Sequence, residues 1–185
     1  MTTKIPGQDG TLSQPQATKL MQFYIDSHAK SIPKDNFDRP LYESLQVLDC
    51  TLHSPGITAK STIRLKVPPN LSNQQEGKTP RNTHGGAIPM MFDLPTSITI
   101  VACNFSNWES TGMTRRLDVT YLKPPVEGDD VILESEVLNI GKRLATIRGV
   151  LKRERDGVVL AVCQHDKYMG DRAHYVGEKW DVSKL

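Results

Sequence analysis

GGAIPMMFDLPTSITIVAC, residues 85–103, is the most apolar stretch of its length in this chain, and it opens with two glycines. Such a stretch predicts a buried helix. Pro95 lies inside it, and a proline removes one helical hydrogen bond, so we expect the helix to kink or end nearby. The rest of the fold must then cover this helix.

The sequence beyond this helix has the pattern of β-strands joined by short turns. Residues 111–122, for example, alternate apolar and polar side chains, and Asp156-Gly157 is a strong hairpin signal. The expected strands are residues 57–67, 111–122, 131–140, 144–153 and 158–168, with weaker β character near Leu45. Short turns predict an antiparallel meander. The fold class is therefore α+β, an antiparallel sheet wrapped around one long central helix.

The composition divides the chain into three segments. Residues 1–40 form an N-terminal extension with a short amphipathic helix near residues 16–30, followed by a proline-rich connector. Residues 41–172 form one domain, and residues 173–185 form a polar tail. Within the domain, NLSNQQEGKTPRN, residues 70–82, predicts a long polar loop, and such loops are usually functional or disordered.

Charge and cysteine usage exclude several classes of partner. The net charge of the 185 residues is +2, and no apolar run approaches the roughly 20 residues that span a bilayer, so we expect no nucleic-acid or membrane partner. The three cysteines are odd in number and far apart, which predicts reduced, mostly buried thiols. No metal site is expected, because ligand spacing is lacking around His28, His53, His165 and His174.

The last three residues, Ser183-Lys184-Leu185, match the tripeptide read by the peroxisomal import receptor. The polar segment before them is expected to leave this signal accessible. We therefore expect the import receptor as a partner and the peroxisome as the location.

Asp93 is the first candidate for chemistry. It is the only carboxylate between Glu76 and Glu109, and its neighbours in the helix are apolar. A carboxylate in such a place loses hydration and needs partners or a purpose. It could act as a general base for water or as the nucleophile itself.

Gly85 and Gly86 lie where a loop becomes the helix. The first amides of a helix lack internal partners, so they could hold the oxyanion formed when a thioester carbonyl is attacked. Two glycines alone also fit a tight turn. Gly85 and Asp93 are eight residues apart, roughly 12 Å along one helix, so one thioester carbon cannot touch both. If both act in one reaction, two chains must supply them, which predicts a homodimer with shared sites and leaves open a dimer of dimers.

These residues resemble the hotdog-fold thioesterases, in particular the phenylacetate-pathway and human thioesterase-superfamily acyl-CoA hydrolases. The likeness covers about residues 57–170. It rests on His84-Gly85-Gly86 with Asp93 nine positions after the histidine, then on TRRLDVTYLKP, NIGKRLA and the closing QHDKYMG in that order.

The resemblance implies a hotdog fold and hydrolysis of acyl-CoA to a fatty acid and free CoA. No cofactor is implied, because CoA is part of the substrate. Asp93 becomes the base or nucleophile, Gly85 the source of the oxyanion amide, and Thr114 a residue that places water or the thioester. We expect His84 to orient the loop rather than to transfer protons. The residues implied for binding CoA are Gly86, Tyr121, Lys123, Gly141, Lys142, Arg143 and Tyr168.

Three features depart from the family pattern. Family members often carry an asparagine shortly before the histidine, where this chain has Lys78, and Asn73 and Asn82 are the candidates to replace it. A proline inside the central helix is unusual and could reshape the acyl pocket. By simple alternation Thr114 lies on the strand face opposite Leu117, and only a bulge or an interface-facing edge reconciles that with a site role.

Two other functions stay open. A non-catalytic acyl-CoA-binding protein would keep the fold and the loop without turnover. An enoyl-CoA or hydroxyacyl-CoA hydratase-dehydratase would pair a carboxylate with a histidine, and no histidine follows Asp93 within the helix.

Overall fold

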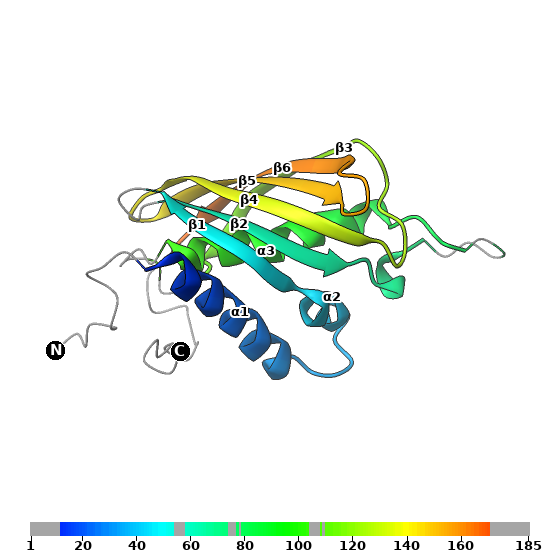
Figure 1. Ribbon diagram of the computed structural model, residues 1–185, viewed down its shortest axis with the longest axis horizontal. Helices are drawn as coiled ribbons and strands as arrows, with labels where there is room; N and C mark the ends of the chain where they lie inside the picture. Colours follow the sequence, from blue (N-terminus) through cyan, green and yellow to red (C-terminus); the bar gives the residue numbers. More distant parts are fainter. Residues whose placement is uncertain are drawn as a thin grey trace.

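Six antiparallel strands curl around one central helix, α3 (Ile88–Ala102), in the computed structural model (Figure 1). The structure describes residues 12–53, 58–73, 77, 79–103, 108 and 110–170. The strands are β1 (Gln46–His53), β2 (Thr58–Lys66), β3 (Met113–Tyr121), β4 (Asp130–Ile140), β5 (Leu144–Arg153) and β6 (Val159–Tyr168). This arrangement confirms the predicted sheet around a central helix.

The central helix differs from the prediction at its start. Residues Gly85–Ala87 form a short 3-10 turn, η2, and the α-helix begins at Ile88. Pro95 is buried but does not end the helix, which continues to Ala102. Next to it, Thr96 Oγ1 donates to the carbonyl oxygen of Phe92 at 2.6 Å, and Thr99 Oγ1 donates to that of Pro95 at 3.0 Å. Both hydroxyl groups thus bond back to a carbonyl oxygen one turn earlier in the helix.

The apolar character of this helix reflects its place in the core. Gly85–Ala102 is long and apolar enough to cross a membrane by length and composition, contrary to the expectation that no run comes near that limit. However, 61% of the stretch is buried inside the fold. Its Met91, Phe92 and Ile98 pack among the inward side chains of the strands, as a core helix must.

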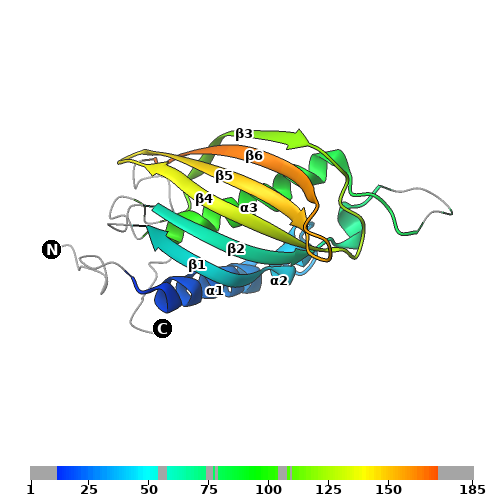
Figure 2. The ribbon, with the colours of Figure 1, turned by 45° about the horizontal axis from the view of Figure 1, so that its top comes forward.

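The strand order is β1-β2-β4-β5-β6-β3, which Figure 2 shows across the sheet. The meander predicted from short turns is confirmed for β4, β5 and β6. It is wrong for β3, which pairs with β6 at the far edge instead of with β4. The reason is that α3 runs beneath the sheet and carries the chain from β2 to the opposite edge, so β3 is left with one free side.

The N-terminal extension completes the core. Helix α1 (Gln14–Ser31) lies where the short helix was predicted and packs on β1 and α3, with Leu20, Met21 and Ile25 buried. Helix α2 (Arg39–Ser44) begins within the expected proline-rich connector and was not predicted. Figure 1 shows α1 alongside β1, where it covers a side of α3 that the curled sheet leaves open, while α2 packs on α1 and β2.

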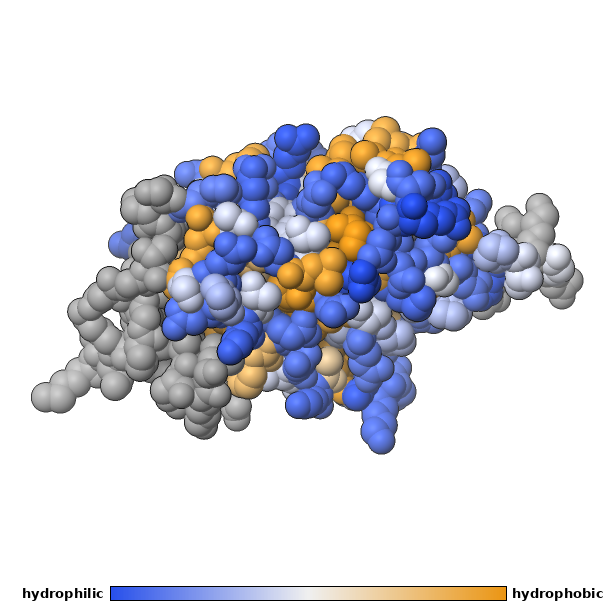
Figure 3. Space-filling model, viewed as in Figure 1, coloured by the Kyte–Doolittle hydropathy of each residue, from blue (hydrophilic) through white to orange (hydrophobic). Residues whose placement is uncertain are grey.

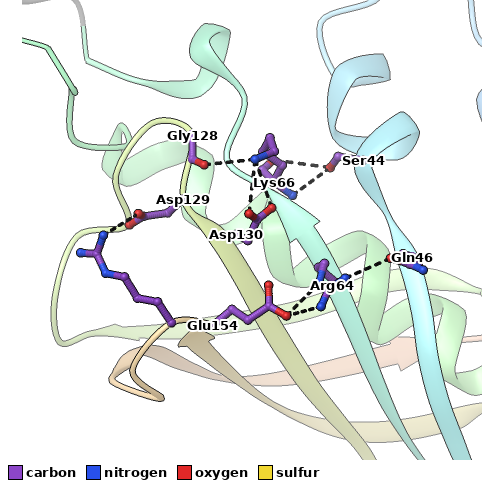
Figure 4. Close-up of polar contacts among 9 residues, drawn as sticks. Ser44, Gln46, Arg64, Lys66, Gly128, Asp129, Asp130 and Glu154 are labelled. Atoms are coloured by element: carbon purple, nitrogen blue, oxygen red, sulfur yellow. Dashed lines mark hydrogen bonds and ion pairs between the residues drawn. The ribbon is translucent and has the colours of Figure 1, made fainter.

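The outer face of the sheet carries ion pairs between strands. Lys60 on β2 lies 2.9 Å from Glu136 on β4, and Lys66 lies 3.2 Å from Asp130. Figure 4 shows Lys66 together with Arg64, which pairs with Glu154 beyond the end of β5. Charged residues outside and apolar residues inside follow the alternation of a sheet with one buried face. The outer face is therefore the solvated one.

The three cysteines are free and buried, as predicted. Burial raises the pKa of the thiols of Cys50, Cys103 and Cys163 to about 12.

Candidate active site

A bulge in β3 turns Thr114 toward the central helix. Thr114 pairs with Lys167 of β6 and Arg116 with Asp166, so Arg115 is the extra residue. The extra residue reverses the alternation at this point. Thr114 consequently lies on the same inner face as Leu117, which pairs with His165. The bulge resolves the conflict that simple alternation posed.

Asp93 contacts two side chains at this point, and through them belongs to a larger polar cluster. Its Oδ1 accepts a hydrogen bond from Thr114 Oγ1 at 2.6 Å and lies 3.3 Å from Nε2 of His165. Lys167 Nζ donates to Thr114 Oγ1 at 3.3 Å and to Ser97 Oγ at 2.8 Å. Among the described residues, no partner is recorded for Oδ2 of Asp93. The side chain of Asp93 is 40% exposed, so this second oxygen is available to solvent or substrate.

His165 is the imidazole of this cluster, and its side chain is 0% exposed. Burial and, after it, the charge of the neighbouring Lys167 lower its pKa to about 4, although Asp93 and Asp166 oppose the change. His165 is therefore neutral near pH 7. Its Nε2 lies 3.0 Å from Thr114 Oγ1, and its Nδ1 lies 2.7 Å from Thr96 Oγ1. Because Thr96 gives its hydroxyl proton to the carbonyl oxygen of Phe92, we assign the imidazole proton to Nδ1, which donates it to Thr96 Oγ1.

Lys167 is the second buried ionisable group, at 3% exposure. Burial lowers the pKa of its ammonium to about 8, and the charge of Asp93 partly offsets this effect. A buried charge needs partners, and Ser97, Thr114 and Asp93 supply them.

The glycine segment forms a separate arrangement. His84 Nδ1 accepts a hydrogen bond from the amide of Gly86 at 3.0 Å, and an orienting role for this histidine stays a prediction. The amide of Gly86 is thus used within the chain, whereas that of Gly85 has no acceptor among the described residues. Tyr121 donates its hydroxyl to the carbonyl oxygen of Gly85 at 3.1 Å. This contact ties the start of η2 to the end of β3.

The two arrangements lie toward opposite ends of β3. Asp93 contacts Thr114 near the start of the strand, and Gly85 contacts Tyr121 at its end. Seven residues of strand separate Thr114 from Tyr121, roughly 20 Å. Within one chain, the structure therefore does not bring Gly85 and Asp93 to one point.

The residues expected to bind CoA divide in the same way. Lys123 follows Tyr121 at the end of β3, and its amide donates to the carbonyl oxygen of Leu160. Tyr168 pairs with Met113 and Leu144, so it lies at the other end of the sheet. The turn at this other end holds Gly141, Lys142 and Arg143.

The asparagine candidates lie near the glycine segment. The amide of Asn73 donates to the carbonyl oxygen of Asn82 at 2.9 Å, so the structure places the two candidates side by side. Lys78 and Ser183-Lys184-Leu185 lie outside the described residues.

A surface cavity of about 530 Å³ lies where the first residues of β3 and β5 meet the last residue of β6. It is lined by Met113, Thr114, Arg115, Leu144 and Tyr168. Another, of about 570 Å³, lies between α2, the end of β2 and the loop before β4, and Pro40, Pro68, Pro69 and Pro80 are among its lining residues. The acid of that second cavity, Glu127, is ion-paired with Arg81 at 2.7 Å. Asp93 lines neither cavity, and the first cavity meets the cluster around Asp93 only through Thr114.

Sequence reasoning missed His165, Lys167, Thr96 and Ser97. A signal was present in β6, where Cys163, His165 and Lys167 occupy alternate inward positions. Two ionisable residues on the buried face of a strand predict a polar partner opposite them. That partner is α3, whose only carboxylate is Asp93.

Comparisons with known proteins agree with this architecture. The family model described as "Thioesterase superfamily" matches residues 81–160. Acyl-coenzyme A thioesterase 13 of Homo sapiens is 27% identical over 88 residues, a match that spans 48% of this chain and 61% of that protein. The match thus covers about three fifths of the length of this curated relative.

Solved structures show the same fold. Thioesterase superfamily member 2 from Mus musculus has a TM-score of 0.62 at 19% identity, covering 83% of this chain and 97% of that one. The zebra fish protein of the same name has a TM-score of 0.61 at 22% identity, covering 86% and 99%. The chain has the hotdog thioesterase fold, and within it residues 81–160 are similar to the thioesterase superfamily.

Proposed function

We propose that this protein hydrolyses acyl-CoA thioesters to a carboxylic acid and free CoA. The observation that carries the proposal is the carboxylate of Asp93, whose Oδ1 is held by Thr114 while its Oδ2 has no partner among the described residues. Such a carboxylate can take a proton from water as the water attacks the thioester carbon, or it can attack that carbon itself. In the first case the C–S bond breaks and the proton that Asp93 took from water passes to the departing sulfur of CoA. In the second case the C–S bond breaks as a mixed anhydride with Asp93 forms, and water then hydrolyses this anhydride, releasing the acid and a proton for the CoA thiolate.

The substrate class is supported by two similarities. The relative at 27% identity is named an acyl-coenzyme A thioesterase. A hypothetical thioesterase from Streptococcus pneumoniae, with a TM-score of 0.53 to this chain, was solved with coenzyme A. Lys123, Lys142 and Arg143 are cations at turns suited to the phosphates of CoA.

The test is release of free thiol from acyl-CoA, followed with a thiol-trapping reagent over a panel from short to long acyl chains. Asp93→Asn keeps the size of the side chain and removes its charge, so we expect it to lower turnover at least ~100-fold. Wild-type protein that binds acyl-CoA without releasing thiol would contradict hydrolysis and support a binding protein. Near-normal turnover of the variant would remove Asp93 from the mechanism.

A hydratase-dehydratase is the second candidate, because His165 lies 3.3 Å from Asp93, which the sequence argument against that function did not foresee. Both nitrogens of His165 are engaged inside the protein and the side chain is fully buried, so it cannot reach a substrate. This favours hydrolysis. Loss of an enoyl-CoA chromophore without thiol release would reverse that preference.

We propose further that two copies share each site. The free edge of β3 exposes Met113 and Tyr121, and Figure 3 shows hydrophobic atoms at the upper rim, where β3 lies in Figure 1. An unpaired edge strand is a template for another strand. Antiparallel pairing of two β3 strands about Leu117 would set the Tyr121 end of one copy, with its Gly85, beside Thr114 and Asp93 of the other.

The charges at the centre of β3 favour this pairing. Arg116 and Asp118 flank Leu117 and form an exposed ion pair within one chain. Paired about Leu117, each arginine would lie opposite an aspartate of the second copy, so the edge is complementary to itself. The same pairing would bring Lys123 of one copy toward Lys142 and Arg143 of the other.

The peroxisome remains the proposed location, on the tripeptide Ser183-Lys184-Leu185 alone. Fusing residues 173–185 to the end of a fluorescent protein should direct it to peroxisomes, and deleting Leu185 should prevent this. A fusion that stays in the cytosol would contradict the proposal.

A further inference from the structure

Lys167 has no part in the reaction proposed above, yet it lies behind the reacting carboxylate. Its buried ammonium donates hydrogen bonds to Ser97 and Thr114. A methionine of similar length would fill the same space without burying a charge. A charge in an apolar interior is unfavourable unless its partners compensate for it. The position therefore calls for a reason connected with those partners.

The hydrogen bonds of Thr114 show what the charge does. A hydroxyl group has one proton to donate and two lone pairs that accept, whereas an ammonium only donates. Thr114 Oγ1 lies 3.3 Å from Lys167 Nζ, which can only donate to it, so this contact uses a lone pair of the hydroxyl and leaves its proton free. That proton goes to Asp93 Oδ1 at 2.6 Å, which is nearer than His165 Nε2 at 3.0 Å.

We propose that Lys167 is a positioning residue of the hydrolase, acting through Thr114 to hold Oδ1 of Asp93 so that Oδ2 faces the reacting water or thioester. The inference rests on the proposed function. It assigns Lys167 no contact with substrate, because Thr114 lies between Lys167 and the carboxylate.

Deprotonation would reverse the arrangement. A neutral amine has a lone pair, so Thr114 could donate to Lys167 and release Asp93. The charged or titratable groups that act on Lys167 are Asp93 from α3 and His165 from its own strand. Because burial brings the pKa of Lys167 down to about 8, this change falls within the range where enzymes can be assayed.

The experiment measures kcat and KM for acyl-CoA from about pH 6 to about pH 10 in wild-type protein, Lys167→Met and Lys167→Gln. We expect wild-type kcat to decline as pH rises through about 8. Lys167→Met should lower kcat ~10- to 100-fold with KM within about threefold, and should lose the alkaline decline. Lys167→Gln retains an N–H donor without a titrating charge, so it should keep more turnover and show no decline.

Lys60→Met is the matched control, since it removes a lysine from the outer face of β2 and should leave both parameters unchanged. Wild-type turnover in Lys167→Met, or an alkaline decline that persists in either variant, would overturn the inference. If Lys167→Met does not fold, the wild-type profile and Lys167→Gln decide in its place. Wild-type protein that releases no thiol would overturn the hydrolase proposal as well, whereas loss of the Lys167 effect alone leaves it standing.

Discussion

Thr114 reaches Asp93 only because Arg115 is an extra residue in β3. Alternation along the sequence places Thr114 on the wrong face, and it indicates only that a bulge or an exposed edge is needed. The bulge itself depends on how β3 pairs with β6, which are more than 40 residues apart along the chain. A local pattern does not contain that pairing. Asp93 could be predicted because its anomaly, an acid among apolar helix residues, is local.

His165 was missed for the same reason. The sequence distance between His165 and the other histidines bears on a possible metal site, but it does not predict contacts between His165 and α3. Only the pairing of Leu117 with His165 and the packing of α3 beneath it bring the imidazole to Asp93. The partners of a buried group come from other elements, whereas its burial can be foreseen from alternation along its own strand.

The buried imidazole should make stability depend on pH. Burial lowers the pKa of His165 from 6.5 to about 4, so the unfolded chain takes up this proton first as pH falls. Stability should therefore decrease from about pH 6.5 to about pH 4, by up to ~3 kcal/mol from this group. Asp93, Asp166 and Lys167 are the charged groups acting on it.

Denaturant unfolding of wild-type protein and His165→Gln across this range would measure the effect. The glutamine cannot titrate, so its stability should change less with pH than that of wild-type protein. Parallel curves for the two proteins would show that other groups cause the loss in acid.

At the scale of elements, the central helix and the strands after it could be predicted, but the place of β3 could not. The apolar stretch and the alternating runs fix what each segment is. Which strands pair depends on the path of α3 beneath the sheet, and that path is set by packing. A tight contact with β5 illustrates the packing, since Gly149 faces the ring of Phe92.

Gly149→Ala should test this contact. A Cβ at this position would lie 2.8 Å from Cys163 Sγ and 2.9 Å from the ring of Phe92, closer than atoms can pack. We expect a loss of about 1–3 kcal/mol in the free energy of unfolding. Ser135→Ala is the control, because Ser135 is the partner of Gly149 on β4 and its buried hydroxyl has no hydrogen-bond partner among the described residues. That change should cost nothing, and equal losses in both variants would contradict the argument.

At the scale of the whole molecule, the sequence and the structure both indicate that a site using Gly85 and Asp93 needs two chains. Eight residues of helix separate Gly85 from Asp93, and Tyr121 and Thr114 hold them toward opposite ends of β3. A site that uses both groups is incomplete in a single chain. The separation could be predicted from the sequence. The free edge of β3, through which a second copy could complete the site, could not, because it depends on how the strands pair.

Mixed dimers would test the shared site directly. Gly85→Pro removes the amide proposed for the oxyanion, and proline is tolerated at the start of a helix. Dimers of Gly85→Pro or of Asp93→Asn should each be inactive. When both variants are co-expressed with different tags, a mixed dimer keeps one intact site, formed by Asp93 of the Gly85→Pro copy and Gly85 of the Asp93→Asn copy. Random pairing should then restore about a quarter of wild-type turnover.

The control for these mixed dimers is Asp93→Asn paired with a copy that carries both changes, which offers no intact Asp93 and should stay inactive. Tag-purified mixed dimers of the two single variants without recovered turnover would contradict a site shared across the β3 edge. Recovery requires the amide and the carboxylate to come from different copies, because neither copy alone carries both. Pairing of the two β3 edges would bring the Tyr121 end of one copy to the Thr114 end of the other, and that is the geometry that recovery of turnover would support.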